Sequence, residues 1–407
     1  MPDNNDYYVT YGFGYARYLH NSNNIVQNLT VFVPNEDSLK INILNLKNTL
    51  PRKRTLKLVY YIKPVLGEDE IKSNGYINLE FNDNSNMIFA KNLANSDFDN
   101  ICYVSSSEKI TSYTGDKKFF FGKGHLGNPE GLSATELNRD LRFGENSIIA
   151  IELKIDLEAF ENKEICLLLG EEKTKLECQD TAYKYMKLSY CNDELNKVKR
   201  FWKELVEKLQ VYTPLESTNI LLNGWAIYQT LSCRLWGKTG FYQSGGAFGY
   251  RDQLQDSIAI KYVNSDITKE QIITHSKHQF IEGDVEHWWH DETGKGIRTR
   301  FSDDLLWLPF VLSDYIRYTN DYSILDIVTN YKQGAPLEEG IDERYDKYED
   351  SEIKGTIYEH AIKAIEHSFK FGDNGLPKIG SGDWNDGFST VGNKGKGESV
   401  WLRILYV

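Results

Sequence analysis

Asn192–Gln210, NDELNKVKRFWKELVEKLQ, is the stretch at which the chain changes from one kind of secondary structure to another. Its apolar residues recur with the period of a helix at positions Val198, Phe201, Trp202, Leu205, Val206 and Leu209. Lysines and glutamates occupy the opposite face, so we expect an amphipathic helix that ends before Pro214. The sequence therefore predicts a helical linker over residues 191–215, with a different domain on each side.

Upstream of this helix, residues 1–190 have the pattern of a β domain. Short alternations of apolar and polar residues, as in Leu29–Val33, Leu56–Ile62 and Ile148–Leu153, are typical of strands with one buried face. Turn-rich spacers such as Asn82–Asn86 separate these runs. Many short strands at this spacing predict a two-sheet β-sandwich, and no cluster of ionisable residues in it indicates catalysis.

Downstream of the linker, residues 216–407 favour helices joined by long loops. Helices are expected over residues 217–236, 252–264, 268–280, 303–317, 322–332, 356–371 and 397–406. The loops between them are rich in Gly, Trp, His and Asp, which is typical of ordered loops that build a site; they are 237–251, 281–302 and 372–396. Residues 347–352 are expected to form a solvated surface loop.

Composition limits the classes of partner and the cellular compartment. The chain has 407 residues, a formal net charge of −12, and five cysteines without CxxC spacing. The negative charge argues against nucleic acid and anionic membranes as default partners. No apolar run reaches about 18 residues, and the N-terminus lacks the basic and apolar regions of a signal peptide. We therefore expect a cytoplasmic protein with reduced thiols and no membrane span.

The stretch most informative about chemistry is Gly380–Gly387, GSGDWNDG. Its two carboxylates, Asp383 and Asp386, flank an indole, Trp384, and an amide. A sugar ring can stack on an indole while a neighbouring carboxyl group protonates the glycosidic oxygen. The structural alternative is an Asp/Asn/Gly turn around a buried tryptophan.

A second stretch, Gly245–Asp256, places polar groups at the start of an expected helix. Arg251 and Asp252 begin this helix, and Gln255 lies within one turn of them. A forked donor and several acceptors at one helix end suit the hydroxyl groups of a sugar. A capping box with a local ion pair is the alternative.

A third stretch, Glu282–His290, combines acids, histidines and tryptophans. His287 and His290 with the acids beside them could bind a metal, but this spacing is not a standard zinc pattern, and no metal site is expected. A platform for a sugar with basic residues nearby is favoured. Lys394–Gly397 is basic and glycine-rich and could approach an anion, although a surface turn is the simpler interpretation.

Taken together, these stretches resemble the inverting phosphorylases of glycoside hydrolase family 94. The resemblance covers nearly the whole chain and rests in its second half on four motifs in order: Tyr242–Asp256, Glu282–His290, Ser302–Pro309 and Gly382–Gly387. The first motif is more similar to β-1,2-glucan members, which include oligoglucan phosphorylases and the phosphorylase-like region of cyclic β-1,2-glucan synthases. Gly12–Ser22 and Leu29–Pro34 also resemble that branch.

The resemblance implies a β-sandwich, a helical linker and an (α/α)6 barrel that is incomplete within residues 216–407. By motif position, Asp386 matches the general acid, Trp384 a residue of the glycone subsite and Asp252 a ligand of a sugar hydroxyl. The whole expected substrate-binding set is Asp252, Arg251, Trp384, Asp383 and Gln255, with Asp383 orienting the loop. The chain departs from the cellobiose enzymes near Gly245–Gly246, where one glycone-binding arginine falls in a gap.

A phosphorylase needs only one carboxylic acid from the protein, because inorganic phosphate is itself an anionic nucleophile and no general base is required. The expected reaction transfers a glucosyl unit from a β-glucan, expected to be β-1,2-linked, to phosphate and gives α-glucose 1-phosphate, or runs in reverse. Burial beside Trp384 is expected to keep Asp386 protonated near neutral pH. Phosphate is a co-substrate, and no cofactor is expected.

Residues 216–407 hold fewer expected helices than a closed (α/α)6 barrel requires. The resemblance places the phosphate-binding residues and a C-terminal β domain beyond them. We therefore expect a fragment that is inactive alone and that forms a homodimer or joins the missing C-terminal portion of the same enzyme. The alternatives are an inverting β-glucan hydrolase and a non-catalytic carbohydrate-binding or assembly module of a cyclic glucan synthase.

Overall fold

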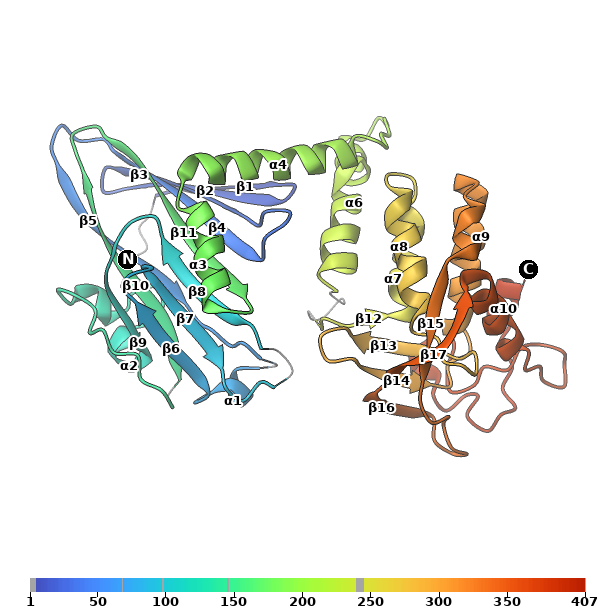
Figure 1. Ribbon diagram of the computed structural model, residues 1–407. Coiled ribbons are helices and arrows are strands. Elements are labelled where there is room, and N and C mark those ends of the chain that lie inside the picture. The colour runs from blue at the N-terminus through green and yellow to red at the C-terminus, as the bar shows by residue number, and fades with distance from the viewer. Residues whose placement is uncertain (1–4, 68, 97–98, 145, 239–244, 407) are drawn as a thin grey trace. The chain divides into compact units, whose positions relative to one another are not determined.

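The computed structural model describes residues 5–67, 69–96, 99–144, 146–238 and 245–406. The chain divides into two compact units, Met1–Lys203 and Glu204–Val407, each with an apolar core of its own (Figure 1). Within the described residues, no helix is both long and apolar enough to cross a bilayer.

The first unit is built from two antiparallel sheets. The larger one has eight strands in the order β1-β2-β3-β4-β11-β8-β7-β6: β1 (Tyr7–Gly12), β2 (Tyr15–Ser22), β3 (Ile25–Phe32), β4 (Leu39–Asn48), β11 (Asn162–Glu172), β8 (Ile101–Ser106), β7 (Met87–Asn92) and β6 (Ile77–Asn82). The smaller one has the order β5-β10-β9: β5 (Arg54–Ile62), β10 (Ser147–Leu157) and β9 (Ile110–Asp116).

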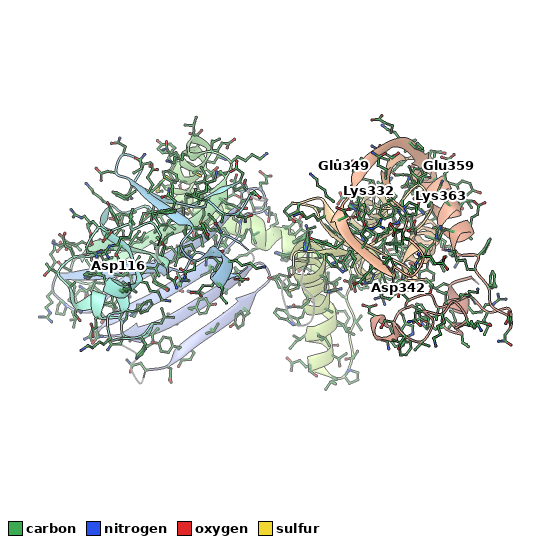
Figure 2. All side chains as sticks on the ribbon, turned by 90° about the horizontal axis from the view of Figure 1, so that it is seen from below. Asp116, Lys332, Asp342, Glu349, Glu359 and Lys363 are labelled. Carbon is green, nitrogen blue, oxygen red and sulfur yellow. The ribbon has the colours of Figure 1, made fainter. Side chains whose placement is uncertain are left out.

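The two sheets share one apolar core. Ile88 of β7 and Ile151 and Leu153 of β10 are fully buried in it. The alternating runs of the sequence fall on β3, β5 and β10, and the turn-rich spacer connects β6 to β7, so the predicted two-sheet sandwich is confirmed. Short helices complete the unit: α1 (Glu70–Ser73), α2 (Lys117–Phe121) and α3 (Lys175–Tyr185). Asp116, labelled in Figure 2, caps α2 by accepting from its first backbone N–H groups.

The helix expected at the change of pattern is α4 (Leu188–Val206). Its apolar face is buried from Cys191 to Val206, but Leu209 lies past the helix end and is 40% exposed. The turn between β1 and β2 packs closely on this face. Gly14 has φ +78°, and a Cβ there would lie 2.6 Å from the indole of Trp202, so only glycine fits.

Six α-helices are described in the second unit: α5 (Glu216–Ile220), α6 (Ala226–Gln229), α7 (Tyr250–Ile260), α8 (Ser265–Ser276), α9 (Trp307–Thr319) and α10 (Ile357–Ser368). The helical stretch that contains α5 and α6 is interrupted at Asn223–Gly224, whose dihedral angles are not helical. The apolar core is formed by side chains of α7 to α10, among them Leu254, Ile272 and Leu308. Glu359, labelled in Figure 2, completes a capping box with Thr356 at the start of α10.

The second unit also contains strands that the sequence analysis did not predict. A four-stranded sheet has the order β12-β13-β14-β16: β12 (Phe248–Gly249), β13 (Glu286–His290), β14 (Lys295–Thr299) and β16 (Glu343–Lys347). A separate antiparallel pair consists of β15 (Val328–Gln333) and β17 (Glu349–Thr356).

Four local predictions are therefore wrong. The expected loop 281–302 contains the β13–β14 hairpin, and the expected surface loop 347–352 contains the start of β17. The expected helix 322–332 is a 3-10 turn followed by β15, because the β-branched run Ile327-Val328-Thr329 fits a pleated strand better than a helix. The expected helix 397–406 is reduced to a 3-10 turn over Leu402–Tyr406.

Candidate active site

Arg251, in the first turn of α7, connects the GSGDWNDG loop to the start of this helix. Its Nη2 donates to Asp386 Oδ1 at 2.8 Å, although the two residues are 135 positions apart in the sequence. Its Nη1 donates to Asp303 Oδ2 at 3.1 Å and to the carbonyl oxygen of Asp383 at 3.0 Å. The Arg251 side chain is 11% exposed and Asp303 is fully buried, so the bond between them is shielded from water.

Behind Arg251 lie two adjacent acids, Asp303 and Asp304, in the turn that precedes α9. Both are buried, and the Oδ1 atom of each has no hydrogen-bond partner within the described part of the chain. Oδ2 of Asp303 also accepts from Trp307 Nε1 at 3.2 Å. Burial first, and then the neighbouring Asp304 carboxylate, raise the pKa of Asp303. The sequence correctly predicted a helix start here, but neither acid caps it: both face the site instead.

His287 on β13 is a second residue that lies close to the Asp386 carboxyl group. Its Nδ1 is 2.7 Å from Asp304 Oδ2, and its Nε2 is 4.0 Å from Asp386 Oδ2. Burial disfavours the charged imidazole, but the Asp304 and Asp386 carboxylates together outweigh this and raise the pKa of His287. The two carboxylate oxygens of Asp386 thus lie near different side chains, Arg251 and His287. Arg251 is bound in turn to the buried Asp303, and His287 to the buried Asp304.

Asp386 and Trp384 are nevertheless open to solvent. The Asp386 side chain is 56% exposed, and Trp384 is 51% exposed with its ring centroid 6.3 Å from that of Trp401. The expectation that burial beside Trp384 protects the proton on Asp386 is therefore wrong for this arrangement. The alternative of a turn around a buried tryptophan is wrong as well.

Asp383, in the same GSGDWNDG loop, is buried and 3% exposed. Its Oδ1 accepts from the backbone N–H of Asn385 at 3.3 Å, and its Oδ2 accepts from Ser399 Oγ at 2.8 Å. Gly382 packs on Phe301 so closely that a Cβ would come within 1.9 Å of the ring. These contacts fix the backbone of the loop, as a loop-orienting role of Asp383 requires; that role stays a prediction.

The other two predicted ligands lie on α7. Asp252 is exposed, and its Oδ1 is 3.4 Å from Arg234 Nη2. The Nε of the same arginine donates to Asp256 Oδ2 at 2.8 Å. Gln255 is exposed one turn further along the helix. The cap of α7 is Gly249 without a side-chain hydrogen bond, and Arg251 pairs with distant acids, so the alternative of a capping box with a local ion pair is wrong.

The acids and histidines of Glu282–His290 do not form one cluster. Glu286 is buried against His278 Nδ1 at 2.5 Å, whereas His287 is bound to Asp304. Burial raises the pKa of Glu286 to about 8. Within the described residues, no group of three or more His, Cys, Asp or Glu side chains is arranged to hold a metal ion.

Trp289 is too deeply buried to offer a face to a sugar, and the platform expected of this stretch stays a prediction for its other residues. Trp289 is 1% exposed and stacks on His278 with a centroid distance of 3.7 Å and on Phe248 at 5.3 Å. It belongs to the core of the unit.

A second arginine cluster lies on β14, where Arg298 is 1% exposed. Its Nε and Nη2 donate to the two carboxylate oxygens of Asp284 at 2.7 and 2.6 Å, and Nη2 also donates to Glu282 at 3.0 Å. Its Nη1 donates to the carbonyl oxygens of Gly334 and Ala335 at 3.1 and 3.3 Å. The guanidinium carbon lies 3.9 Å from the ring centroid of Phe280.

Several site residues were absent from the predicted set: Arg234, His287, Asp303 and Asp304. The sequence signal for the acid pair was the Ser302–Pro309 motif, whose two successive acids exceed what a helix start needs. Of the first motif, Tyr242–Ser244 lie outside the described residues.

Comparison with known proteins places the chain in a family. A model described as the catalytic domain of the glycosyl hydrolase 94 superfamily matches residues 201–407. A model described as the supersandwich domain of glycosyl hydrolase 94 matches residues 1–188.

Three curated relatives match nearly the whole chain. A cyclic beta-(1,2)-glucan synthase of Rhizobium meliloti is 31% identical over 96% of the chain, which spans 14% of that protein. A solabiose phosphorylase of Paenibacillus borealis is 27% identical over 98%, and an N,N'-diacetylchitobiose phosphorylase of Vibrio furnissii is 24% identical over 99%. The chain spans about half the length of these two phosphorylases, 49% and 52%.

Among solved structures, a bacterial glucoamylase complexed with acarbose is similar to this chain. The TM-score is 0.51 with 12% sequence identity, over 77% of this chain and 47% of the glucoamylase. At this identity the likeness concerns the fold alone.

Proposed function

This chain belongs to glycosyl hydrolase family 94, and we propose that it forms a region of an enzyme that transfers a glucosyl unit from a β-glucan, with β-1,2 linkages, to inorganic phosphate. The product is α-glucose 1-phosphate, and the reaction also runs in the synthetic direction. Support for a phosphorylase-type glycosyltransferase comes from the phosphorylase relatives, and support for the β-1,2 linkage from the Rhizobium synthase. The observation that carries the proposal is the 2.8 Å bond between Arg251 and Asp386, which joins the motif loop to the polar start of α7.

In the proposed reaction, Asp386 donates its proton to the glycosidic oxygen. The bond between this oxygen and C1 breaks, and a phosphate oxygen forms a new bond to C1 from the opposite face of the ring, which inverts the configuration. The exposed indole of Trp384 offers a face on which the glucosyl unit stacks. The free carboxylate oxygen of Asp252 and the amide of Gln255, both exposed on α7, are positioned to bind sugar hydroxyls.

A general acid beside an arginine needs an explanation, because an adjacent cation stabilises the carboxylate form. The charge of Arg251 is already shared with Asp303, whose carboxylate oxygen lies 3.1 Å away, and Asp304 lies next in the chain. Arg251 therefore positions Asp386 without presenting it with an uncompensated positive charge. A glucosyl unit on Trp384 would also exclude water from the Asp386 carboxyl, and this desolvation favours its protonated form.

The domain organisation is part of the same proposal. We infer a β-sandwich over 1–190, a helical linker over 191–215, and a region of an (α/α)6 barrel over 216–407 that contains α7 to α10. The five cysteines are free thiols, in keeping with a cytoplasmic location, which stays a prediction.

The test compares wild type with Asp386→Asn in the full-length enzyme that contains this region, on a β-1,2-linked glucooligosaccharide, with and without inorganic phosphate. The expected result is glucose 1-phosphate only when phosphate is present, and a loss of about 10²–10⁴-fold in the variant, which is the usual contribution of a general acid. Asn keeps the size of the side chain and can still accept from Arg251, so folding should be unchanged.

The other outcomes select the alternatives. Release of reducing sugar without phosphate would identify an inverting hydrolase. Saturable binding of the oligosaccharide that needs Trp384, with no turnover under any condition, would identify a carbohydrate-binding or assembly module. Equal turnover in Asp386→Asn would show that another group is the acid.

A further inference from the structure

A cavity of about 340 Å³ lies in the second unit. Its walls include Phe301 and Gly380, which are bridged to each other through the backbone. None of Asp386, Arg251 and Trp384 lines it. This volume lies within the range of small-molecule sites, about 300–1,000 Å³.

The lining of the cavity carries more positive than negative charge. Four cationic side chains contribute to it, from Arg298, Arg300, Lys370 and Lys378, against the carboxylates of Glu282 and Asp284. Both carboxylates are already bound by Arg298. Arg300 is occupied by the carbonyl oxygens of residues 337, 338 and 341, which are uncharged. In a chain with a net charge of −12, this local excess of cations is unusual.

Lys370 and Lys378 are the two cations left for a ligand. They are neighbours, because the backbone N–H of Lys378 donates to the carbonyl oxygen of Lys370 at 2.8 Å. In the part of the chain that the structure describes, no carboxylate forms an ion pair with either ammonium group. Lys370 Nζ instead donates to His367 Nε2 at 2.9 Å, and His367 Nδ1 donates to the carbonyl oxygen of Glu282 at 2.7 Å.

The electrostatics of this corner are incompletely compensated. Burial lowers the pKa of His367, and the neighbouring Lys370 lowers it further, so the imidazole is neutral and accepts from the ammonium group. Burial likewise lowers the pKa of Lys370. A bound anion would reverse this effect and supply the missing counter-charge.

The remaining walls indicate more than a bare ion. Phe301, Leu305, Pro336 and Leu337 give one side of the cavity an apolar surface. On another side, Gly395 has φ +69° and nothing within 4 Å of the place where a Cβ would stand, so its backbone is open to a ligand. This glycine belongs to the basic, glycine-rich segment Lys394–Gly397.

We propose that this cavity binds a small phosphate monoester of monosaccharide size, with its phosphate on Lys370 and Lys378 and its carbon skeleton against Phe301 and Leu337. The site is separate from the proposed active site. It recognises a doubly charged tetrahedral group through two ammonium donors, and its size admits a hexose phosphate.

The experiment is calorimetric titration of the 407-residue chain with glucose 6-phosphate, inorganic phosphate and glucose. Glucose 6-phosphate is the probe because it is not the product of the proposed reaction. We expect saturable binding of glucose 6-phosphate, weaker binding of inorganic phosphate and none of glucose. Lys370→Gln and Lys378→Gln should each weaken binding of glucose 6-phosphate about tenfold, and the double variant should abolish it.

Lys354→Gln is the matched control, because it removes the same charge from an exposed position on β17 and should leave the affinity unchanged. Asp386→Asn should also bind glucose 6-phosphate normally, which separates this site from the proposed function. Thermal melting checks folding: Lys370 is exposed and forms no ion pair within the described residues, so Lys370→Gln should not lower the melting temperature. The proposal is overturned if glucose 6-phosphate does not bind the wild type saturably, or if the double variant binds it undiminished. Equal affinities for inorganic phosphate and glucose 6-phosphate would show that the site does not recognise the sugar part of a monoester.

Discussion

Arg251 and Arg298 lie in the same unit, and each binds two carboxylates, yet they differ in how completely the hydrogen bonds of the cluster are satisfied. Arg298 uses all five N–H donors of a guanidinium: three go to Asp284 and Glu282, and two go to backbone carbonyl oxygens. Arg251 holds one fully buried acid, Asp303, and one acid that is 56% exposed, Asp386.

We call the group of Arg298, Asp284 and Glu282 the closed cluster, because no N–H donor of its arginine is left for a substrate. We call the group of Arg251, Asp303 and Asp386 the open cluster, because its exposed acid can still bind one. Around Arg251, buried carboxylate oxygens of Asp303 and Asp304 lack partners within the described residues, and Asp386 faces solvent. Unsatisfied polar groups are costly in a folded protein and concentrate where function requires them. The comparison teaches that saturation of hydrogen bonds, more than charge, separates an arginine that holds the fold from one that organises a site.

The largest expected effect is on the closed cluster. Arg298→Met keeps the length of the side chain but leaves Glu282 and Asp284 without their cation, so the free energy of unfolding should fall by about 3–5 kcal/mol. Chemical denaturation measures this. Arg317→Met is the control, because this arginine is exposed on α9 and forms no ion pair within the described residues, so little stability should be lost. Equal losses in the two variants would contradict a structural role for Arg298.

Arg251→Met should be less damaging to the fold, at about 1–3 kcal/mol. Its exposed partner, Asp386, can be solvated by water, and Asp303 can take up a proton because its pKa is already raised by burial and by Asp304. Affinity for a β-1,2-linked oligosaccharide should fall strongly, since the motif loop loses its link to α7. If Arg251→Met destabilises the chain as much as Arg298→Met, the distinction between an open and a closed cluster fails.

The sequence predicts the sandwich well, since strands such as β10 alternate over a fully buried face and local pattern is sufficient. It misses β16 and β17, which are polar and mostly exposed, so that no apolar alternation identifies them. Their pairing depends on register with distant strands, which a local pattern does not encode.

For the site, sequence reasoning finds Arg251 and Asp252 because they are adjacent in the sequence and lie together at the start of one helix, α7. It misses the contacts of Asp303 and His287, because these cross 52 and 17 positions and exist only after the helices pack. It also does not show which tryptophans are exposed. The exposure of an indole depends on the side chains that pack around it: Trp384 is 51% exposed, whereas Trp289 is 1% exposed.

The pH dependence of stability should distinguish the open cluster further. A carboxyl whose native pKa is raised above its unfolded value binds protons more tightly when folded. It stabilises the fold below its unfolded pKa and loses this contribution as the pH rises through the native value. Asp303 is in this position, so the free energy of unfolding should fall between pH 5 and pH 8 by about 1–2 kcal/mol.

Asp303→Asn should flatten this slope, whereas the exposed substitution Asp346→Asn should leave it unchanged. A residual slope of the same sign is expected from His287, whose pKa is raised by Asp304 and Asp386 despite burial and whose contribution is also lost as the pH rises. A wild-type stability that rises from pH 5 to pH 8 would contradict the raised pKa of Asp303.

The smallest expected effect on folding belongs to Trp384, in the same loop as Asp386 of the open cluster. Trp384→Leu should change the free energy of unfolding by no more than about 0.5 kcal/mol, because half of the indole already faces water. The same substitution should weaken binding of a β-1,2-linked oligosaccharide about tenfold, since a stacking face for the glucosyl ring is lost. Tyr358→Leu on α10 is the matched control: its ring is 55% exposed, and neither stability nor oligosaccharide binding should change. If both substitutions leave binding intact, the sugar does not stack on the motif loop, and the open cluster around Arg251 must serve another ligand.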